Sequence, residues 1–284
     1  MPKPSVSSVS IKKFANDRWS VANDLLAAEE PLEIRLGFGQ MDMREVLKVS
    51  VTMRTPGNDF DLATGFLFTE GIIASANDVL SVKYCSDGNR IENVENIVRV
   101  ELHPNVEVDS SILQRNFYTT SGCGICGKAS IEAIHTVCRI STNDSEWKTN
   151  KEVILQLNDS LRNKQYVFEF TGGIHAAALF DINGNLLVVR EDVGRHNALD
   201  KLIGHLLMNT SSSVVPPQSI LLLSGRASFE LLQKAAMAGI QLVCAVGAPS
   251  ALAVETANSF GITLIGFLRE NRFNVYTNSH RIAE

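Results

Sequence analysis

The sequence has few cysteines, no long apolar run and no excess of positive charge. Its 284 residues include five cysteines, an odd number with only one close pair, so we expect a reducing compartment rather than a disulfide framework. No segment approaches the roughly 20 apolar residues of a membrane span, and residues 1–20 lack a signal-peptide core. A net charge of −5 argues against general binding to nucleic acid or anionic membranes. These absences predict a soluble cytoplasmic protein with neither nucleic acid nor membrane as a partner.

The chain is long enough for two domains, and its pattern changes partway along. We expect a β-rich N-terminal domain over residues 1–118, a cysteine loop and helix connection over 119–160, and an α/β layered domain over 161–284. The first half carries four apolar segments typical of short strands, at 32–36, 46–53, 79–84 and 98–102. One helix is predicted between Asn58 and Gly71.

From residue 166 onward, short apolar strands alternate with helices that carry an apolar stripe. The predicted strands are 176–180, 186–189, 220–223, 242–246 and 263–267, and the predicted helices are 197–207, 228–238 and 250–260. Alternation of this kind is typical of a layered α/β domain with a mainly parallel sheet. The fold class is therefore α/β in the second half and α+β overall.

The cysteine pair, Cys123 and Cys126, lies among glycines and beside Lys128, just before a predicted helix over 128–139. A helix N-terminus and a nearby lysine favour the thiolate, which is the reactive form of cysteine. The same spacing would supply half of a zinc site, although Cys85, Cys138 and Cys244 form no second pair. Spacing alone leaves a reactive thiol, a metal ligand pair and an inert loop equally weighted.

A second group of polar residues follows a predicted strand at 190–197. Gly194, Arg195 and His196 could bind a phosphate at the start of the next helix, through free backbone N–H groups and positive charge. The alternative is an N-cap network in which Asp192 and Asn197 satisfy those backbone donors. Taken alone, the alternative is at least as well supported.

Similar junctions follow the next strands, and all would lie at one edge of the sheet. Ser224, Gly225 and Arg226 form one junction, and residues 247–250 form another. A further turn consists of Phe267, Leu268, Arg269, Glu270, Asn271 and Arg272. Because ligands of α/β sheets bind beyond the carboxyl ends of the strands, these loops predict one anion-binding crevice. The turn could also be a solvated charged loop, and His175 nearby is either an acid–base group or a structural histidine.

Together these segments resemble the formate dehydrogenase accessory sulfurtransferase family, known as the FdhD family. The resemblance covers nearly the whole chain and rests on residues 30–35, 53–57, 65–71, the cysteine loop, 190–204, 224–239 and 273–277. It implies a sulfurtransferase in which Cys123 bears a persulfide and Cys126 assists transfer or holds the sulfur in turn. It also implies that 267–272 binds the molybdenum cofactor, bis-molybdopterin guanine dinucleotide, as a substrate, with no intrinsic metal site.

The resemblance further implies the partners and the fold of the second half. A cysteine desulfurase would load the sulfur, formate dehydrogenase would receive the cofactor, and the protein would be a homodimer. The C-terminal domain would be cytidine-deaminase-like, but deaminase chemistry needs a glutamate and zinc ligands at two helix starts. Here those starts carry His196-Asn197-Ala198 and residues 224–228, which lack them. A cofactor-binding chaperone that does not use its thiols is the remaining alternative.

Overall fold

The computed structural model describes residues 3–85, 95–108, 147–210 and 214–283. Cys123, Cys126 and the predicted helix over 128–139 lie outside the described residues. The predicted domain boundary at 118 lies outside the described residues too, so the division into domains at 118 and 160 stays a prediction.

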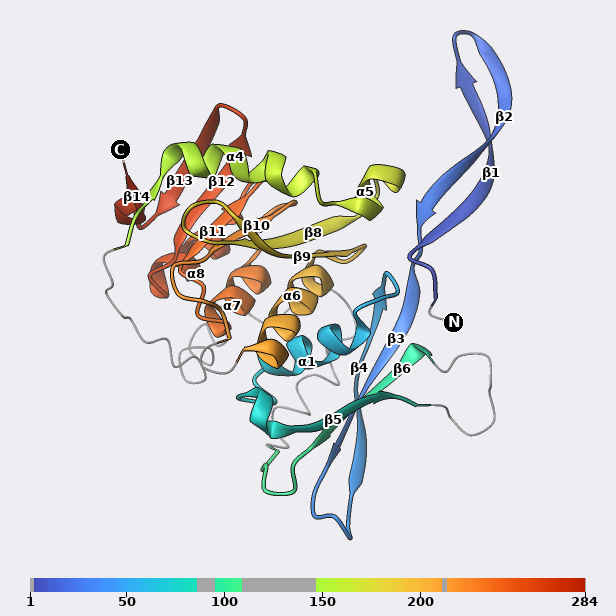
Figure 1. Ribbon diagram of the computed structural model, residues 1–284, viewed down its shortest axis with the longest axis vertical. Helices are drawn as coiled ribbons and strands as arrows, with labels where there is room; N and C mark the ends of the chain where they lie inside the picture. Colours follow the sequence, from blue (N-terminus) through green and yellow to red (C-terminus); the bar gives the residue numbers. More distant parts are fainter. Residues whose placement is uncertain (1–2, 86–94, 109–146, 211–213, 284) are drawn as a thin grey trace.

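The chain begins with a two-stranded antiparallel hairpin that projects from the body of the molecule (Figure 1). Its strands are β1 (Val6–Ala15) and β2 (Arg18–Ala27). Asn16 and Asp17 form the connecting turn with φ angles of 52° and 57°. Asparagine and aspartate tolerate this left-handed region better than most residues, which makes them typical of a two-residue hairpin turn. We refer to residues 6–27 as the arm.

The arm leads into a four-stranded sheet and one helix. The strands are β3 (Glu30–Phe38), β4 (Glu45–Arg54), β5 (Val79–Tyr84) and β6 (Ile97–Leu102), in the order β4-β3-β6-β5. Helix α1 (Asp59–Thr69) and the short 3-10 helix η1 (Ala76–Asp78) complete this part. These elements confirm the four strands and the helix predicted from the sequence.

The second half contains a six-stranded sheet in the order β13-β12-β11-β10-β8-β9. Its strands are β8 (His175–Phe180), β9 (Leu186–Asp192), β10 (Ile220–Leu223), β11 (Leu242–Ala245), β12 (Thr263–Arg269) and β13 (Arg272–Thr277). Only β10–β11 and β11–β12 pair in parallel, so the expectation of a mainly parallel sheet is wrong. The reason is that the turns at 181–185 and 270–271 are too short for a crossover and therefore form hairpins.

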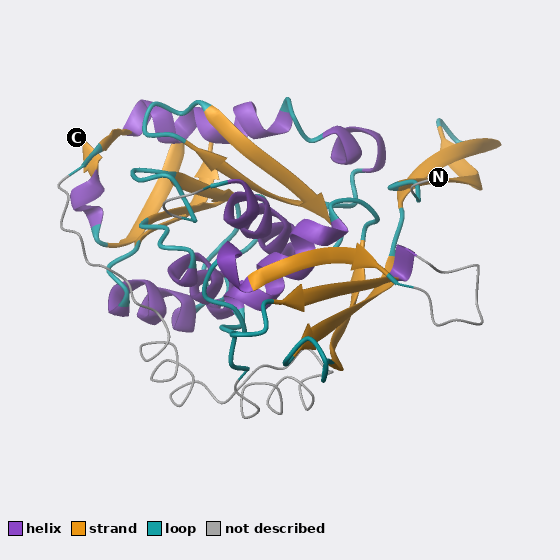
Figure 2. Ribbon diagram, turned by 60° about the horizontal axis from the view of Figure 1, so that its bottom comes forward, coloured by secondary structure: helices purple, strands orange, loops and turns teal. Residues whose placement is uncertain are grey.

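Helices cover both faces of this sheet (Figure 2). On one face lie α4 (Lys151–Arg162) and the short α5 (Tyr166–Thr171), and on the other lie α6 (Arg195–Asn209), α7 (Phe229–Met237) and α8 (Ala251–Ser259). Ala176, Ala178 and Phe180 belong to the core under α4, whereas Ala177 and Leu179 belong to the core under α6. Strand β8 is thus buried on both faces. The remaining short elements are β7 (Thr149–Asn150), η3 (Ser279–Arg281) and β14 (Ile282–Ala283).

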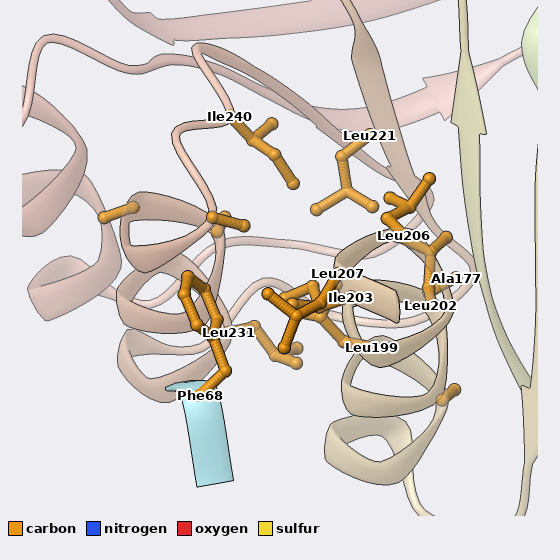
Figure 3. Packing of buried hydrophobic residues seen from close by; sticks show 14 of the residues in the cluster. Phe68, Ala177, Leu199, Leu202, Ile203, Leu206, Leu207, Leu221, Leu231 and Ile240 are labelled. Atoms are coloured by element: carbon orange, nitrogen blue, oxygen red, sulfur yellow. The ribbon is translucent and has the colours of Figure 1, made fainter. Parts of the chain in front are cut away.

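Helix α6 joins the two halves of the molecule. Its apolar side chains share one buried cluster with Leu221 of β10, Leu231 of α7 and Phe68 of α1 (Figure 3). The backbones of α1 and α6 meet at two glycines: a Cβ added to Gly65 would lie 1.9 Å from the Asp200 carbonyl oxygen. One added to Gly204 would lie 1.9 Å from the Asp61 carbonyl oxygen. This close approach fixes the start of α6, and with it the turn at 192–196, against the N-terminal half.

Candidate functional site

The loops predicted to form a crevice lie along one edge of the large sheet. Strand β8 runs antiparallel to both β9 and β10, and β10, β11 and β12 run parallel to one another. Strands β9, β10, β11 and β12 therefore all point the same way, and their carboxyl ends meet at one edge. The starts of β8 and β13 lie at that edge too. The structure thus brings all the predicted crevice segments together, in the order 192–196, 175, 224–226, 247–250 and 267–272.

Backbone hydrogen bonds tie these loops to one another. The Ala176 N–H donates to Ser224 Oγ at 2.8 Å, and the Gly247 N–H donates to the Gly225 carbonyl at 2.8 Å. The Phe267 N–H donates to the Gly247 carbonyl at 3.1 Å. Gly247 has no room for a side chain, because a Cβ there would lie 2.9 Å from the backbone of Arg226. The edge is therefore a rigid surface rather than a set of independent loops.

Cationic and aromatic side chains line this edge. Arg226, Arg269 and Arg272 are exposed, and the Arg269 guanidinium is held by the Val246 carbonyl at 2.6 Å. Phe267 is exposed, and its positive φ of 53° is a conformation that costs free energy in a residue other than glycine. The exposed Glu270 and Asn271 form the turn, whereas the Leu268 side chain is fully buried in the core under α4. A ligand could reach the other five side chains of 267–272 but not that of Leu268.

Asp192 organises the turn that precedes α6. Its Oδ1 accepts hydrogen bonds from the Gly194 N–H at 2.8 Å and from Asn197 Nδ2 at 3.1 Å. Its Oδ2 accepts from the Thr55 N–H at 3.1 Å and pairs with Lys201 Nζ at 2.7 Å. Asp192 and Lys201 are both buried. The carboxylate therefore ties the turn to the N-terminal half, as the N-cap alternative anticipated in part.

The same turn carries Arg195 and His196, two of the residues predicted to bind an anion. Gly194 is the N-cap residue of α6 and makes no side-chain cap hydrogen bond. Arg195 Nε and His196 Nε2 are buried atoms without a hydrogen-bond partner among the described residues. Buried polar atoms are usually hydrogen-bonded, so these two unpaired nitrogens mark this turn as a candidate anion site. The Asp192 hydrogen bonds bear out part of the N-cap interpretation, and anion binding at this turn stays a prediction.

A ladder of polar and charged residues, His196, Asp200, Glu230, Lys234 and Glu70, connects α6 with α7 and the end of α1. His196 Nε2 lies 3.8 Å from Glu230 Oε2, and one helical turn deeper Asp200 Oδ2 lies 3.0 Å from Lys234 Nζ. Glu70, at the end of α1, also pairs with Lys234 at 3.2 Å. Although burial disfavours its charge, Asp200 and Glu70 raise the pKa of Lys234 above its ordinary value. The ladder fixes the relative position of the two helix N-termini.

The ladder also determines the charge of His196. Burial and the positive charges of Lys234 and Arg195 lower the pKa of His196 to about 4. His196 is therefore neutral near pH 7 and supplies a hydrogen bond rather than charge, so Arg195 provides the positive charge at this turn. His175 is half-buried against Gly225, and burial together with Arg195 lowers its pKa as well.

The lowered pKa of His196 predicts a pH dependence of stability. Between pH 6.5 and 4 the unfolded chain binds a proton at His196 that the folded protein does not, so protonation favours unfolding. We expect the contribution of His196 to be constant above about pH 6.5 and to become less favourable as pH falls toward 4. Urea unfolding at pH 7.5 and 5.0 measures the effect. The free energy of unfolding should fall less between these two pH values for His196→Gln than for the wild type. His280→Gln, at an exposed histidine, is the control, and an equal loss in both variants would contradict the assignment.

The sequence did not reveal Asp200, Glu230 and Lys234 as part of the site, and Glu70 received no role. A signal was present, since His196 and Asp200, like Glu230 and Lys234, are four residues apart and therefore share a helix face. What the sequence could not supply was the packing of the two faces against each other.

The described cysteines lie apart from this chemistry. Cys85 is half-buried, and Cys244 is buried in the core under α4, where burial raises the pKa of its thiol well above the ordinary range. A thiol held protonated in this way is a poor nucleophile. Within the part of the chain that the structure describes, no helix is long and apolar enough to cross a membrane.

Fold and site together define a mixed α/β protein with exposed cationic side chains at the carboxyl ends of its strands. The FdhD/NarQ family model matches residues 27–283, and this chain belongs to that family. It is 49% identical over 269 residues to the "Sulfur carrier protein FdhD" of Streptomyces coelicolor, covering 93% of this chain and 91% of the relative. The relative of the same name from Mycobacterium tuberculosis is 46% identical, with 96% and 97% covered.

A solved structure has the same fold. The crystal structure of a candidate formate dehydrogenase accessory protein from Desulfotalea psychrophila matches with a TM-score of 0.72 over 99% of this chain and 100% of its own. At 22% identity it supports the fold alone.

Proposed function

We propose that this protein is a sulfur carrier that serves formate dehydrogenase. The observation that carries the proposal is the 46–49% identity, over more than nine-tenths of the chain, to proteins named as sulfur carriers. The cysteine pair of the sequence is the group that suits this chemistry, because a thiolate attacks sulfane sulfur readily. The sulfur donor is a cysteine desulfurase, and the protein works in the cytoplasm as a homodimer.

Loading of sulfur is a redox-neutral exchange at Cys123. The Cys123 thiolate attacks the terminal sulfur of a persulfide on the desulfurase. A new S–S bond forms, the old S–S bond breaks, and the desulfurase cysteine leaves as a thiolate. The carrier then holds Cys123 as a persulfide, and Cys126 assists the release of the sulfur.

The substrate that receives the sulfur is the molybdenum cofactor with its two guanine dinucleotides. The crevice suits the nucleotide portions of such a molecule. Arg195, Arg226 and Arg269 supply the positive charge that diphosphates require, and His196 supplies a neutral hydrogen-bonding group. Phe267 provides an exposed aromatic face on which a guanine can stack. This assignment rests on the chemistry of the side chains at the edge.

One alternative is a chaperone that binds the cofactor but transfers no sulfur. Activation of formate dehydrogenase in a reconstituted system distinguishes the two. The double variant Cys123→Ala/Cys126→Ala should retain binding of guanosine diphosphate and lose activation. Activation equal to wild type would support the chaperone. Zinc in a one-to-one ratio by elemental analysis, with loss of stability on chelation, would instead support a structural metal site.

A further inference from the structure

A row of cationic side chains crosses the four-stranded sheet of the N-terminal half. Arg35 of β3 lies directly opposite Lys48 of β4 on one side and Arg99 of β6 on the other. Arg99 in turn lies directly opposite Lys83 of β5. Directly paired residues place their side chains on the same face of a sheet. The row therefore takes one residue from every strand of this sheet, and we refer to these four residues as the cationic row.

The cationic row lies on the face of the sheet that points away from the core. Ile34 and Leu36, the neighbours of Arg35 along β3, are fully buried, and helix α1 lies on their side of the sheet (Figure 1). Lys48 and Lys83, at the two ends of the row, have side chains that are 55% and 52% exposed. A partner can therefore reach the row from solvent.

Two carboxylates neutralise the cationic row only in part. Glu33 pairs with Arg35 at 2.6 Å and with Lys48 at 2.7 Å. Glu101 is shared by three cations at 2.6–3.9 Å, namely Arg44, Arg99 and Lys83. Burial disfavours the charge of both carboxylates, but the surrounding cations lower the pKa of each below its ordinary value, so both are ionised near pH 7. Five cations thus share two negative charges, in a chain whose net charge is −5.

The arrangement of the row is unfavourable for the sheet itself. Like charges directly opposite one another on neighbouring strands are destabilising. Here the four strands carry such neighbours throughout, while Glu33 and Glu101 are more buried than every cation of the row. The positive charge is therefore the outer layer of this face. Conflicts between a local rule and the fold are expected at functional surfaces, which marks the row as a binding feature.

Exposed apolar side chains border the cationic row along β4. Three of them are about half exposed and alternate on the face of the row, namely Val46, Val51 and Met53. The described strands place no aromatic side chain on this face, whereas single-stranded nucleic acid is usually bound through aromatic stacking. Arginine and methionine are enriched in protein interfaces. The composition of the face thus favours a protein partner.

We propose that this face of the N-terminal sheet binds an acidic helix of a partner protein, laid along the cationic row. Neighbouring strands are about 4.8 Å apart, so the four cations are spaced over about 14 Å. A helix with one acidic residue on each turn presents carboxylates about 5.4 Å apart, which matches the spacing of the row. Charge complementarity selects an acidic occupant, and the apolar border on β4 contacts its flank. The inference is independent of the sulfur chemistry.

Replacing the two exposed lysines of the row tests the proposal in the full-length protein. The probe is a fluorescent helical peptide of alanine and glutamine with glutamate at i, i+4, i+7 and i+11, and its binding is measured by anisotropy in about 50 mM salt. Lys48→Gln/Lys83→Gln should weaken binding by about fivefold or more, because two exposed ion pairs are lost. Lys12→Gln/Lys13→Gln removes the same charge from the arm and should bind like the wild type. A wild type that does not prefer this peptide to its all-glutamine counterpart, or equal weakening in both variants, would overturn the proposal.

Lysine footprinting tests where the peptide binds. Acetylation, followed by peptide mass spectrometry, should slow at Lys48 and Lys83 when the peptide is bound and stay unchanged at Lys12 and Lys13. Excess guanosine diphosphate should leave the peptide bound, since the arginines at the edge of the large sheet are not part of the row. Displacement by that nucleotide, or no protection of the two row lysines, would contradict the proposal. An oligothymidylate that binds more tightly through the same two lysines would assign the face to nucleic acid instead.

Discussion

Replacing Cys123 by alanine should abolish activation of formate dehydrogenase and leave the fold unchanged. The expected loss is about a hundredfold or more, because the thiolate that carries the sulfur has no substitute in the described structure. Cys244 is buried and held protonated, and Cys85 is half-buried. Activation of apo-formate dehydrogenase by purified variants, with a desulfurase and cysteine present, measures the effect.

Cys85→Ala is the matched control and should activate like the wild type. Cys126→Ala should lower the rate less than Cys123→Ala, since its role is to assist release. Full activation by Cys123→Ala would show that another group carries the sulfur. Binding of guanosine diphosphate should be equal in all three variants, because the proposed nucleotide site uses residues of the sheet edge and no cysteine.

Replacing Asp192 by alanine should cause the largest loss of stability among single changes at the site. The change leaves Lys201, which is 1% exposed, without its ion-pair partner and removes acceptors from the Thr55 and Gly194 N–H groups. Burial lowers the pKa of Lys201, and Asp192 opposes that shift. Breaking a buried ion pair typically costs about 3–5 kcal/mol, so the free energy of unfolding should fall by about that amount.

A double-mutant cycle separates the ion pair from the rest of the network. Lys201→Met removes the buried charge that Asp192→Ala leaves without a partner. The double variant Asp192→Ala/Lys201→Met should therefore lose less free energy of unfolding than the two single variants lose in sum. Glu255→Ala, an exposed carboxylate on α8, is the control and should change stability by less than about 0.5 kcal/mol. Urea denaturation measures all four variants. Additive losses would show that Asp192 and Lys201 are not coupled.

The sequence predicted those parts of the fold whose pattern depends on burial. Strands β3 and β6 and the helices α7 and α8 bury apolar residues at strand or helical spacing, and that periodicity is visible in the residues themselves. The arm was missed because charged and polar residues interrupt both of its faces and most of its side chains are exposed. The turn at Asn16 and Asp17 was the available signal. Helix α4 was left unassigned although Ile154, Leu157 and Leu161 share one buried face.

The sequence predicted where the candidate site lies, but not the ion pairs and hydrogen bonds that hold it together. Junctions after successive strands could be assigned to one sheet edge by topology, and the observed strand directions place them there. The contacts of Asp192 with Thr55, and of Lys234 with Glu70, join residues more than 130 positions apart. Such pairs depend on how α1 packs on α6, which a single sequence does not encode in any local pattern. The neutral charge of His196 follows from the same packing.

The most direct test of sulfur carriage is the mass of the protein after exposure to a sulfur donor. The purified protein is incubated with a cysteine desulfurase and cysteine, without reductant, and analysed by intact and peptide mass spectrometry. One added sulfur on the peptide that contains Cys123, removable by a thiol reductant and absent from Cys123→Ala, is the predicted result. Guanosine diphosphate binding without any added sulfur on that peptide would contradict the account and assign the protein to the cofactor chaperones.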